Sequence, residues 1–167
     1  PLPQLTGVNK NIFTDLRDIY QNFTIEDAQA IKDIEKITNH DVKAVEYFLK
    51  ETFASHTELH HTSQFIHFGC TSEDINNLAY ALMLKNARND ILIPTATKVS
   101  RTLIDLSAAT ADIPMLARTH GQAASPTTVG KEVANVIARF ETALIDFSTI
   151  ALVGKFNGAV GNYNAHL

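Results

Sequence analysis

Residues 115–140, MLARTHGQAASPTTVGKEVANVIARF, form the segment around which the rest of the chain is organised. It opens as a polar loop around His120 and continues with apolar residues at helical spacing. Ser125 and Pro126 suit the N-cap and the first position of a helix, so we expect a helix over residues 126–153. Because a rigid helix beside a polar loop can hold one imidazole in place, His120 is a candidate acid or base.

The composition is that of a globular chain. With 167 residues, of which 45% are hydrophobic, it is long enough to bury a core. A net charge of −4 without a Lys/Arg cluster argues against a nucleic-acid partner. The single cysteine, Cys70, excludes an internal disulfide and favours a cytoplasmic protein. No apolar run approaches the ~20 residues of a membrane span, so we expect no membrane partner.

Helical periodicity is the only regular pattern, and no convincing strand is present. The expected helices cover residues 5–22, 24–37, 42–53, 71–93 and 94–111, before the long one at 126–153. Thr24 and Asp41 are candidate caps, and Pro94 predicts a break or kink. Helices of this length pack as bundles, so the sequence predicts an all-α fold.

Three polar islands interrupt the apolar pattern: Asn39-His40-Asp41, Thr71-Ser72-Glu73-Asp74 and Thr119-His120-Gly121-Gln122. Each lies at a helix start or in a loop beside one, where free N–H groups favour carboxylate or phosphate ligands. The same residue types are also ordinary helix caps, so each island taken alone admits both interpretations.

Other polar residues are better explained by structure than by function. His56 and His60 are four apart, but no third ligand follows at a fitting spacing, so we expect no metal site. His67 lies between apolar neighbours and is interpreted as a core or edge histidine. Glu46 and Lys50 are predicted to pair on the outside of their helix. The glycines near the C-terminus follow no strand, so no dinucleotide cofactor is expected.

The islands, in this order, resemble the signatures of the fumarase/aspartase superfamily and, within it, the adenylosuccinate lyases. The matching stretches are Thr71-Ser72-Glu73-Asp74, Thr119-His120-Gly121-Gln122, Pro126-Thr127-Thr128, Gly130-Lys131-Glu132 and residues 39–47 and 158–164. Gly121 stands where fumarases and argininosuccinate lyases usually carry Leu. The likeness covers essentially the whole chain, although the superfamily's serine-bearing catalytic loop is not within it.

The resemblance implies a long-helix bundle and a reaction that releases fumarate without a cofactor. His120 matches the general acid of the family, and the positions that match its substrate pocket are Asn39, His40, Asp41, Thr71, Ser72 and Thr119. It also implies a homotetramer in which three subunits build each active site.

We therefore expect an internal fragment of about a third of such an enzyme, inactive by itself. Residues 1–70 would be the latter part of an N-terminal helical domain, and residues 71–167 the first helices of the central bundle. Two alternatives remain: a non-catalytic helical assembly module, and another fumarate-releasing lyase such as argininosuccinate lyase.

Overall fold

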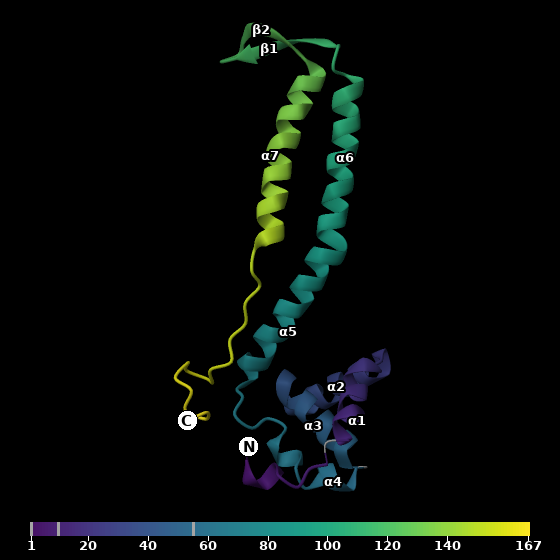
Figure 1. Cartoon of the computed structure of the whole chain (residues 1–167), viewed down its shortest axis with the longest axis vertical. Coiled ribbons are helices and arrows are strands. Elements are labelled where there is room, and N and C mark those ends of the chain that lie inside the picture. The colour runs from purple at the N-terminus through teal and green to yellow at the C-terminus, as the bar shows by residue number, and fades with distance from the viewer. Residues whose placement is uncertain (1, 10, 55) are drawn as a thin grey trace. The chain divides into compact units, whose positions relative to one another are not determined.

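In the computed structural model the described residues are 2–9, 11–54 and 56–167 (Figure 1). The chain forms two compact units. One consists of the residues up to 78 together with residues 154–167, and the other of residues 79–153. The expected boundary near residue 70 refers to the domains of a longer enzyme and stays a prediction.

Helices make up most of the first unit. They are η1 (Pro3–Leu5), α1 (Ile12–Gln21), α2 (Ile25–Thr38), α3 (Asp41–Ala54), α4 (Thr57–His60), η2 (Ser63–Phe65) and the start of α5 (Ser72–Asn86). The predicted cap of α2 is confirmed. The Thr24 side chain accepts a hydrogen bond from the Asp27 N–H, and the Asp27 carboxylate accepts one from the Thr24 N–H. This reciprocal pair satisfies two of the free donors at the start of the helix.

The helix expected over residues 5–22 is shorter than predicted, because α1 begins only at Ile12. Residues 6 and 7 form a turn, and the Asn9 carboxamide accepts the Asn11 N–H at 3.0 Å. Asparagine side chains compete in this way with helical hydrogen bonds, so α1 begins only after Asn11 although the apolar residues are already at helical spacing before it.

Glu46 lies inside the first unit, so the prediction that it sits on the outside of α3 is wrong. Its side chain is only 7% exposed. The predicted partner Lys50 donates to it at 2.8 Å, and Lys43 donates at the same distance. His67, 21 residues further along the chain, places its Nδ1 2.9 Å from the Glu46 Oε2. This contact with a distant segment helps to bury a carboxylate that α3 alone would leave in water.

Acid is expected to weaken this cluster. Burial would raise the pKa of Glu46, but hydrogen bonds from Lys43, Lys50 and His67 outweigh it and lower the pKa from 4.5 to about 2. The resulting stabilisation is present above pH ~4.5 and is lost as the pH falls toward 2, since the unfolded chain takes up its proton first. We expect Glu46→Gln to lower the Tm at neutral pH and to flatten the Tm profile in acid, with about one proton fewer taken up on unfolding.

The measurement is thermal unfolding followed by circular dichroism between pH 7 and pH 2. Glu51→Gln is the matched control, because Glu51 lies on the same helix and is exposed. An equal loss of stability in both variants would contradict the assignment.

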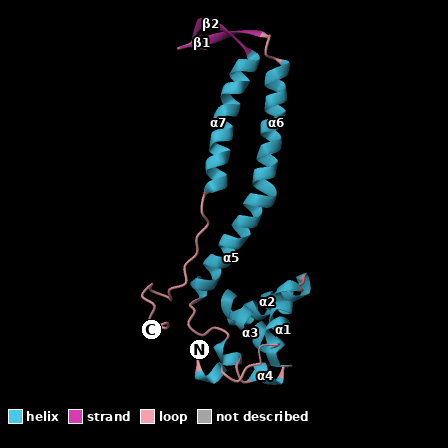
Figure 2. Ribbon diagram, viewed as in Figure 1, coloured by secondary structure: helices cyan, strands magenta, loops and turns pink. Residues whose placement is uncertain are grey.

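The second unit consists of two long helical segments and a hairpin (Figure 2). Its elements are the end of α5, the π-helical segment η3 (Ala87–Leu92), α6 (Ile93–Ala109), the strands β1 (Pro114–Thr119) and β2 (Gln122–Thr128), and α7 (Val129–Thr149). The break expected at Pro94 takes the form of η3, which interrupts the α-helical hydrogen bonds just before the proline. Pro94 itself lies in the first turn of α6, where its missing N–H is not needed.

The strands β1 and β2 pair antiparallel, so the expectation that no strand is present is wrong. The register runs from Pro114 opposite Thr128 to Thr119 opposite Gln122, with an irregularity near Leu116. Nearly all residues of β1 are exposed, and β2 is mostly exposed as well. A hairpin without a buried face lacks the alternation of apolar and polar residues that reveals a strand in a sequence.

The same hairpin changes the start of the long helix. Ser125 and Pro126 belong to β2, and α7 begins at Val129 with Thr128 as its cap, accepting the Lys131 N–H at 3.2 Å. A proline is tolerated in β2 because a strand of a two-stranded sheet has one edge unpaired. The helix ends at Thr149, four residues before the predicted end.

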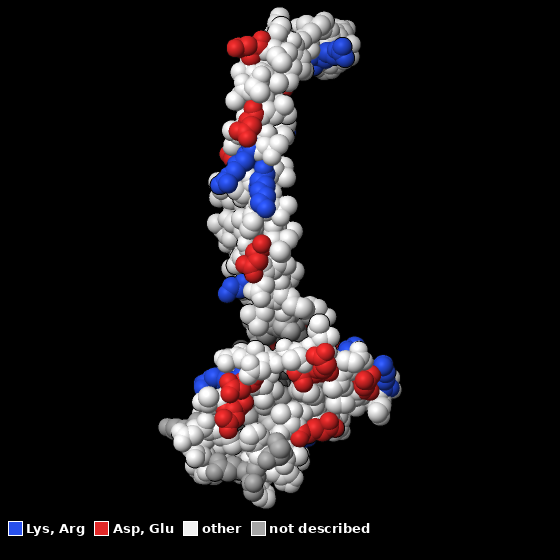
Figure 3. Space-filling model, turned by 90° about the vertical axis from the view of Figure 1, so that its right-hand side faces the viewer, with Lys and Arg blue, Asp and Glu red and all other residues white. Residues whose placement is uncertain are grey.

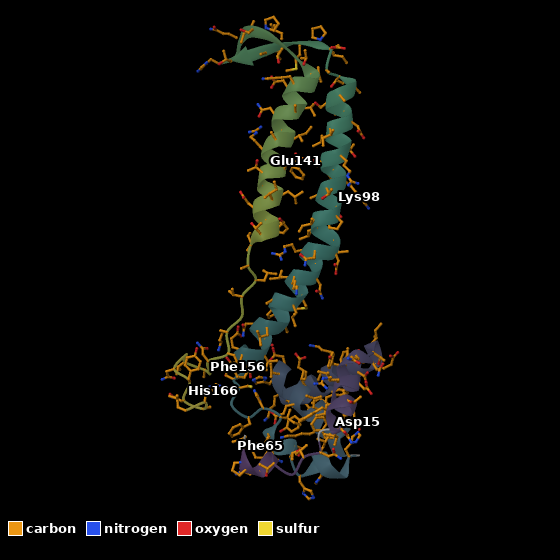
Figure 4. All side chains as sticks on the ribbon, viewed as in Figure 1. Asp15, Phe65, Lys98, Glu141, Phe156 and His166 are labelled. Carbon is orange, nitrogen blue, oxygen red and sulfur yellow. The ribbon has the colours of Figure 1, made fainter. Side chains whose placement is uncertain are left out.

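α6 and α7 lie side by side (Figure 1). They approach closely at Gly130, whose carbonyl accepts a hydrogen bond from the Ser107 hydroxyl at 2.7 Å. Further along, the buried Ser100 hydroxyl donates to Glu141 on α7 at 2.7 Å (Figure 4). The predicted all-α fold is therefore confirmed, with the hairpin as its one addition among the described residues.

Much apolar surface remains exposed on the second unit. Figure 3 shows charged side chains widely spaced among uncharged ones along this part of the chain. The exposed apolar residues include Ile91, Val99, Ile104, Leu106, Val136 and Ile145. Within the described ranges, no helix has both the length and the hydropathy that crossing a membrane requires.

Candidate functional site

The first island, Asn39-His40-Asp41, is the connection between α2 and α3. Asn39 has a φ of 51°, in the left-handed region, and its N–H closes α2 by donating to the Glu35 carbonyl at 2.8 Å. Asparagine adopts this conformation more readily than most residues. His40, rather than the predicted Asp41, caps α3 because its Nδ1 accepts the Lys43 N–H at 3.3 Å.

The second island meets the first at the start of α5. The Ser72 hydroxyl lies 3.4 Å from the His40 Nε2, although 32 residues separate them. One turn further along α5, the Asn76 amide donates to Asp41 at 3.0 Å. Hydrogen bonds from the Val42 N–H and from Asn76 lower the pKa of Asp41, which keeps its carboxylate charged. The structure thus brings together the expected substrate residues His40, Asp41 and Ser72, with Asn39 and Thr71 beside them in the chain.

Asp74, which the sequence presents only as a first-turn acid, is completely buried. Its carboxylate lies 2.8 Å from the Lys155 Nζ. It also accepts hydrogen bonds from the N–H groups of Thr71, Asn157 and Gly158, at 2.9, 3.1 and 3.2 Å. The hydrogen bond from Lys155 is the largest cause of a pKa far below the ordinary range. Asp74 therefore ties the start of α5 to the glycine-containing segment near the C-terminus.

Beside this tie lies a cavity of about 330 Å³, whose lining includes Thr71, Gly158 and Asn162. It borders the N-terminus of α5, where backbone N–H groups favour anionic ligands. Cys70 also lines the cavity, and burial raises the pKa of its thiol, so the structure gives it no reactive character. Within residues 154–167, the rings of Phe156 and His166 are in contact, with their centroids 5.4 Å apart (Figure 4).

The third island forms the hairpin turn of the second unit. Thr119 pairs with Gln122, which leaves a two-residue turn of His120 and Gly121 with φ values of 50° and 74°. Two successive left-handed residues are typical of the type I′ turn that joins tight hairpins. The Thr119 hydroxyl and the His120 Nδ1 share a hydrogen bond of 2.8 Å. No other described residue bonds to the ring, so Nε2 is the nitrogen left for a substrate.

The turn requires a left-handed backbone conformation at Gly121. A Cβ there would meet no neighbouring atom, but its φ of 74° is one that residues with a side chain rarely adopt. We expect Gly121→Ala to cost about 1 kcal/mol through the backbone alone. The expected result is a Tm lowered by a few degrees, measured by thermal unfolding, together with a displaced His120.

Gly121→Asn is the matched variant, because asparagine tolerates the left-handed region. It should retain more of the wild-type Tm than Gly121→Ala. Equal loss in the two variants would show that backbone conformation is not the cause.

The sequence did not reveal the roles of three residues in these networks. They are Asn76, Lys155 and Asp74, whose burial and long-range contacts were not predicted. Asn76 had a recognisable signal, since it follows Ser72 by four residues and so shares its helix face. Lys155 had none, because 81 residues separate it from Asp74. Among the described residues, no group of three or more His, Cys, Asp or Glu side chains is placed to hold a metal ion.

Chemically, the islands provide groups that hydrogen-bond an anionic ligand and an imidazole that can transfer a proton. The first unit supplies hydroxyl, imidazole and amide groups at two helix starts. The second unit supplies an exposed histidine, oriented by a neighbouring hydroxyl and a tight turn.

Known proteins resemble this chain closely in sequence. The protein named adenylosuccinate lyase from Escherichia coli (strain K12) is 56% identical over 149 residues, which cover 89% of this chain and 33% of that protein. The protein of that name from Haemophilus influenzae is 54% identical over 157 residues, covering 94% of this chain and 34% of that protein. The one from Legionella pneumophila (strain Corby) is 47% identical over 166 residues, covering 99% and 36%. The chain thus spans about a third of the length of the curated relatives it matches.

Solved structures share the fold at lower identity. A fumarate lyase from Mesorhizobium sp. BNC1 superposes with a TM-score of 0.74 at 22% identity, covering 95% of this chain and 36% of that one. A 3-carboxy-cis,cis-muconate lactonizing enzyme from Pseudomonas putida gives a TM-score of 0.67 at 24% identity, covering 82% and 31%. At this identity the likeness concerns the fold alone. The family described as Lyase matches residues 3–167, nearly the whole chain, and this chain belongs to that family.

Proposed function

We propose that this chain is part of an adenylosuccinate lyase. Such an enzyme eliminates fumarate from adenylosuccinate to give AMP, and from succinylaminoimidazole carboxamide ribotide, in purine biosynthesis. The observation that carries the proposal is the 56% identity over 149 residues to the Escherichia coli protein of that name. The exposed imidazole in the hairpin turn and the polar groups at two helix starts are consistent with it.

Elimination requires a proton at the leaving nitrogen as its bond to carbon breaks, while the neighbouring carbon loses a proton to a base. His120 is the proposed donor, since an imidazole titrates in the physiological range and the bond from Thr119 orients its ring. The superfamily's serine base is not in this stretch of sequence. This chain therefore supplies the acid side of the reaction.

The substrate carries a phosphate and two carboxylates, which suit hydroxyl, amide and imidazole groups at helix starts. We assign substrate binding to Asn39, His40, Asp41, Thr71, Ser72 and Thr119. Asp41 is itself an anion, so its part is to hold donors such as the Asn76 amide rather than to meet the phosphate directly.

We also propose a cytoplasmic homotetramer that needs neither metal nor cofactor. Exposed apolar side chains along α6 and α7 provide surface that a helical bundle would cover. In that assembly, residues 1–70 would belong to an N-terminal helical domain and residues 71–167 to the central bundle.

The test follows adenylosuccinate by its absorbance with a lyase of the relatives' full length that contains these 167 residues. Conversion to AMP with stoichiometric release of fumarate is the expected result. Release of fumarate from argininosuccinate instead would reassign the substrate, and turnover of neither compound would favour a helical assembly module.

The 167-residue chain by itself is expected to be inactive, because the acid is present but the superfamily's base is not. The same assay on the purified chain should show fumarate release at least ~10³-fold slower than the full-length enzyme, the usual scale of losing one catalytic group. Rates near those of the full-length enzyme would overturn the assignment of the base to another stretch.

A further inference from the structure

Asn76 is not among the residues proposed to bind substrate, but its side chain forms a hydrogen bond with one of them, Asp41. Asn76 lies half-buried on α5, one turn after Ser72. Its amide Nδ2 donates to the Asp41 Oδ2 at 3.0 Å, across 35 residues of chain. A hydrogen bond to a charged acceptor is among the stronger ones in proteins.

Asp41 uses its other oxygen differently. Its Oδ1 accepts the Val42 N–H at 2.7 Å and lies 3.2 Å from the His40 Nδ1. With Asn76 on one oxygen and the backbone on the other, the carboxylate is held at both ends. Without Asn76 the Asp41 side chain, which is 57% exposed, would keep only the hydrogen bond from the Val42 N–H and would lose its tie to α5.

His40 completes the network. In the neutral ring Nδ1 accepts the Lys43 N–H at 3.3 Å and Nε2 carries the hydrogen. In the protonated ring both nitrogens are donors, and Nδ1 can then donate to the Asp41 Oδ1, 3.2 Å away. Nε2 lies 3.4 Å from the Ser72 hydroxyl, which can accept the bond. Since Ser72 and Asn76 lie one turn apart on α5, the contacts run from α5 through the first island and back to the same helix.

We propose that Asn76 is a positioning residue, which holds Asp41 and through it sets His40 and Ser72 in the arrangement that binds substrate. This inference rests on the proposed function. The amide matters because it donates: aspartate at this position has the same shape but would place a second carboxylate against Asp41.

A double-mutant cycle in the full-length lyase tests the inference. Asn76→Ala should raise the KM for adenylosuccinate about tenfold and change kcat less than about threefold, since one charge-assisted hydrogen bond is lost away from the proton transfer. In an Asp41→Ala background the same change should add less than about twofold, because residues that act through one another are not additive. Asn76→Asp should raise the KM more than Asn76→Ala does.

Asn86→Ala is the matched control, since Asn86 lies exposed at the end of the same helix. It should leave both constants unchanged. Additive effects of Asn76→Ala and Asp41→Ala, or an Asn76→Asp variant no worse than Asn76→Ala, would overturn the inference.

A second measurement does not depend on turnover. In protein labelled with ¹³C-histidine, the His40 signal is identified by its loss in His40→Gln. It should move in the same direction in Asn76→Ala and in Asp41→Ala, and stay in place in Asn86→Ala. An unmoved His40 signal in Asn76→Ala would refute the positioning role even if adenylosuccinate proved not to be the substrate. A wild type that leaves adenylosuccinate intact refutes the proposed function alone.

Discussion

His120→Ala is expected to lower kcat for fumarate release by about 10²–10⁴-fold in the full-length lyase, the range measured for losing one general acid. The proposed step needs a proton at the leaving nitrogen, and His120 presents its free Nε2 from an exposed turn. Because the side chain is exposed and the turn lies at the tip of the hairpin, the variant should retain its helices and its oligomeric state. The measurement is steady-state absorbance of adenylosuccinate, with circular dichroism and size-exclusion chromatography on the same samples.

The backbone of His120 requires a matched variant. Its φ of 50° disfavours alanine, so His120→Ala changes both the acid and the turn. His120→Asn removes the acid but retains a residue that accepts the left-handed region. Both variants should lose activity alike if proton transfer is the cause. If His120→Asn is as active as the wild type, the acid must be another group, and His40 becomes the candidate.

Gly130→Ala is expected to destabilise the second unit by about 1–3 kcal/mol, the usual range for overpacking a close contact. A Cβ on Gly130 would lie 2.3 Å from the Ser107 carbonyl oxygen and 2.7 Å from the Ala111 Cα. These are backbone atoms, so no side chain can rotate away and α6 and α7 must separate. In most helices, replacing glycine by alanine stabilises the helix by about 1 kcal/mol. At Gly130 we expect the opposite sign, because the added Cβ meets the neighbouring backbone.

The same displacement should reach the hairpin that carries His120. The Gly130 N–H donates to the Thr110 carbonyl, and the Val129 N–H to the Ile113 carbonyl, each at 3.0 Å. These bonds hold the base of the hairpin against the end of α6. We therefore expect Gly130→Ala to lower the Tm by several degrees and to reduce kcat as well.

Gly7→Ala is the control for Gly130→Ala. A Cβ on Gly7 would have no atom within 4 Å, so that variant should match the wild type in both Tm and kcat. A Gly130→Ala variant as stable as the wild type would show that the two helices can separate at that point without cost.

Local signals in the sequence predicted most of the helices and misplaced some of their ends. The cap at Thr24 was predicted correctly because its partner, Asp27, is three residues away. The N-cap predicted at Ser125 was wrong, because Ser125 and Pro126 lie in β2, and helical spacing does not reveal that this segment pairs with β1. The expected site residues of the first and second islands lie close together, with His40 and Ser72 in contact. The substrate-binding roles assigned to these residues stay predictions.

The helical class, the three polar islands and the likeness to a lyase family could all be predicted from the sequence, because each depends on residue types at short, regular spacings. The burial of Glu46 and Asp74 and the hydrogen bond from Asn76 to Asp41 became visible only in the folded chain. The same is true of the left-handed turn that His120 occupies. Burial and hydrogen bonding of this kind depend on partners 21 to 84 residues away in the chain, or on the pairing of a hairpin with no buried face. A local sequence pattern does not indicate which residues, distant in the chain, a side chain will contact in the folded protein.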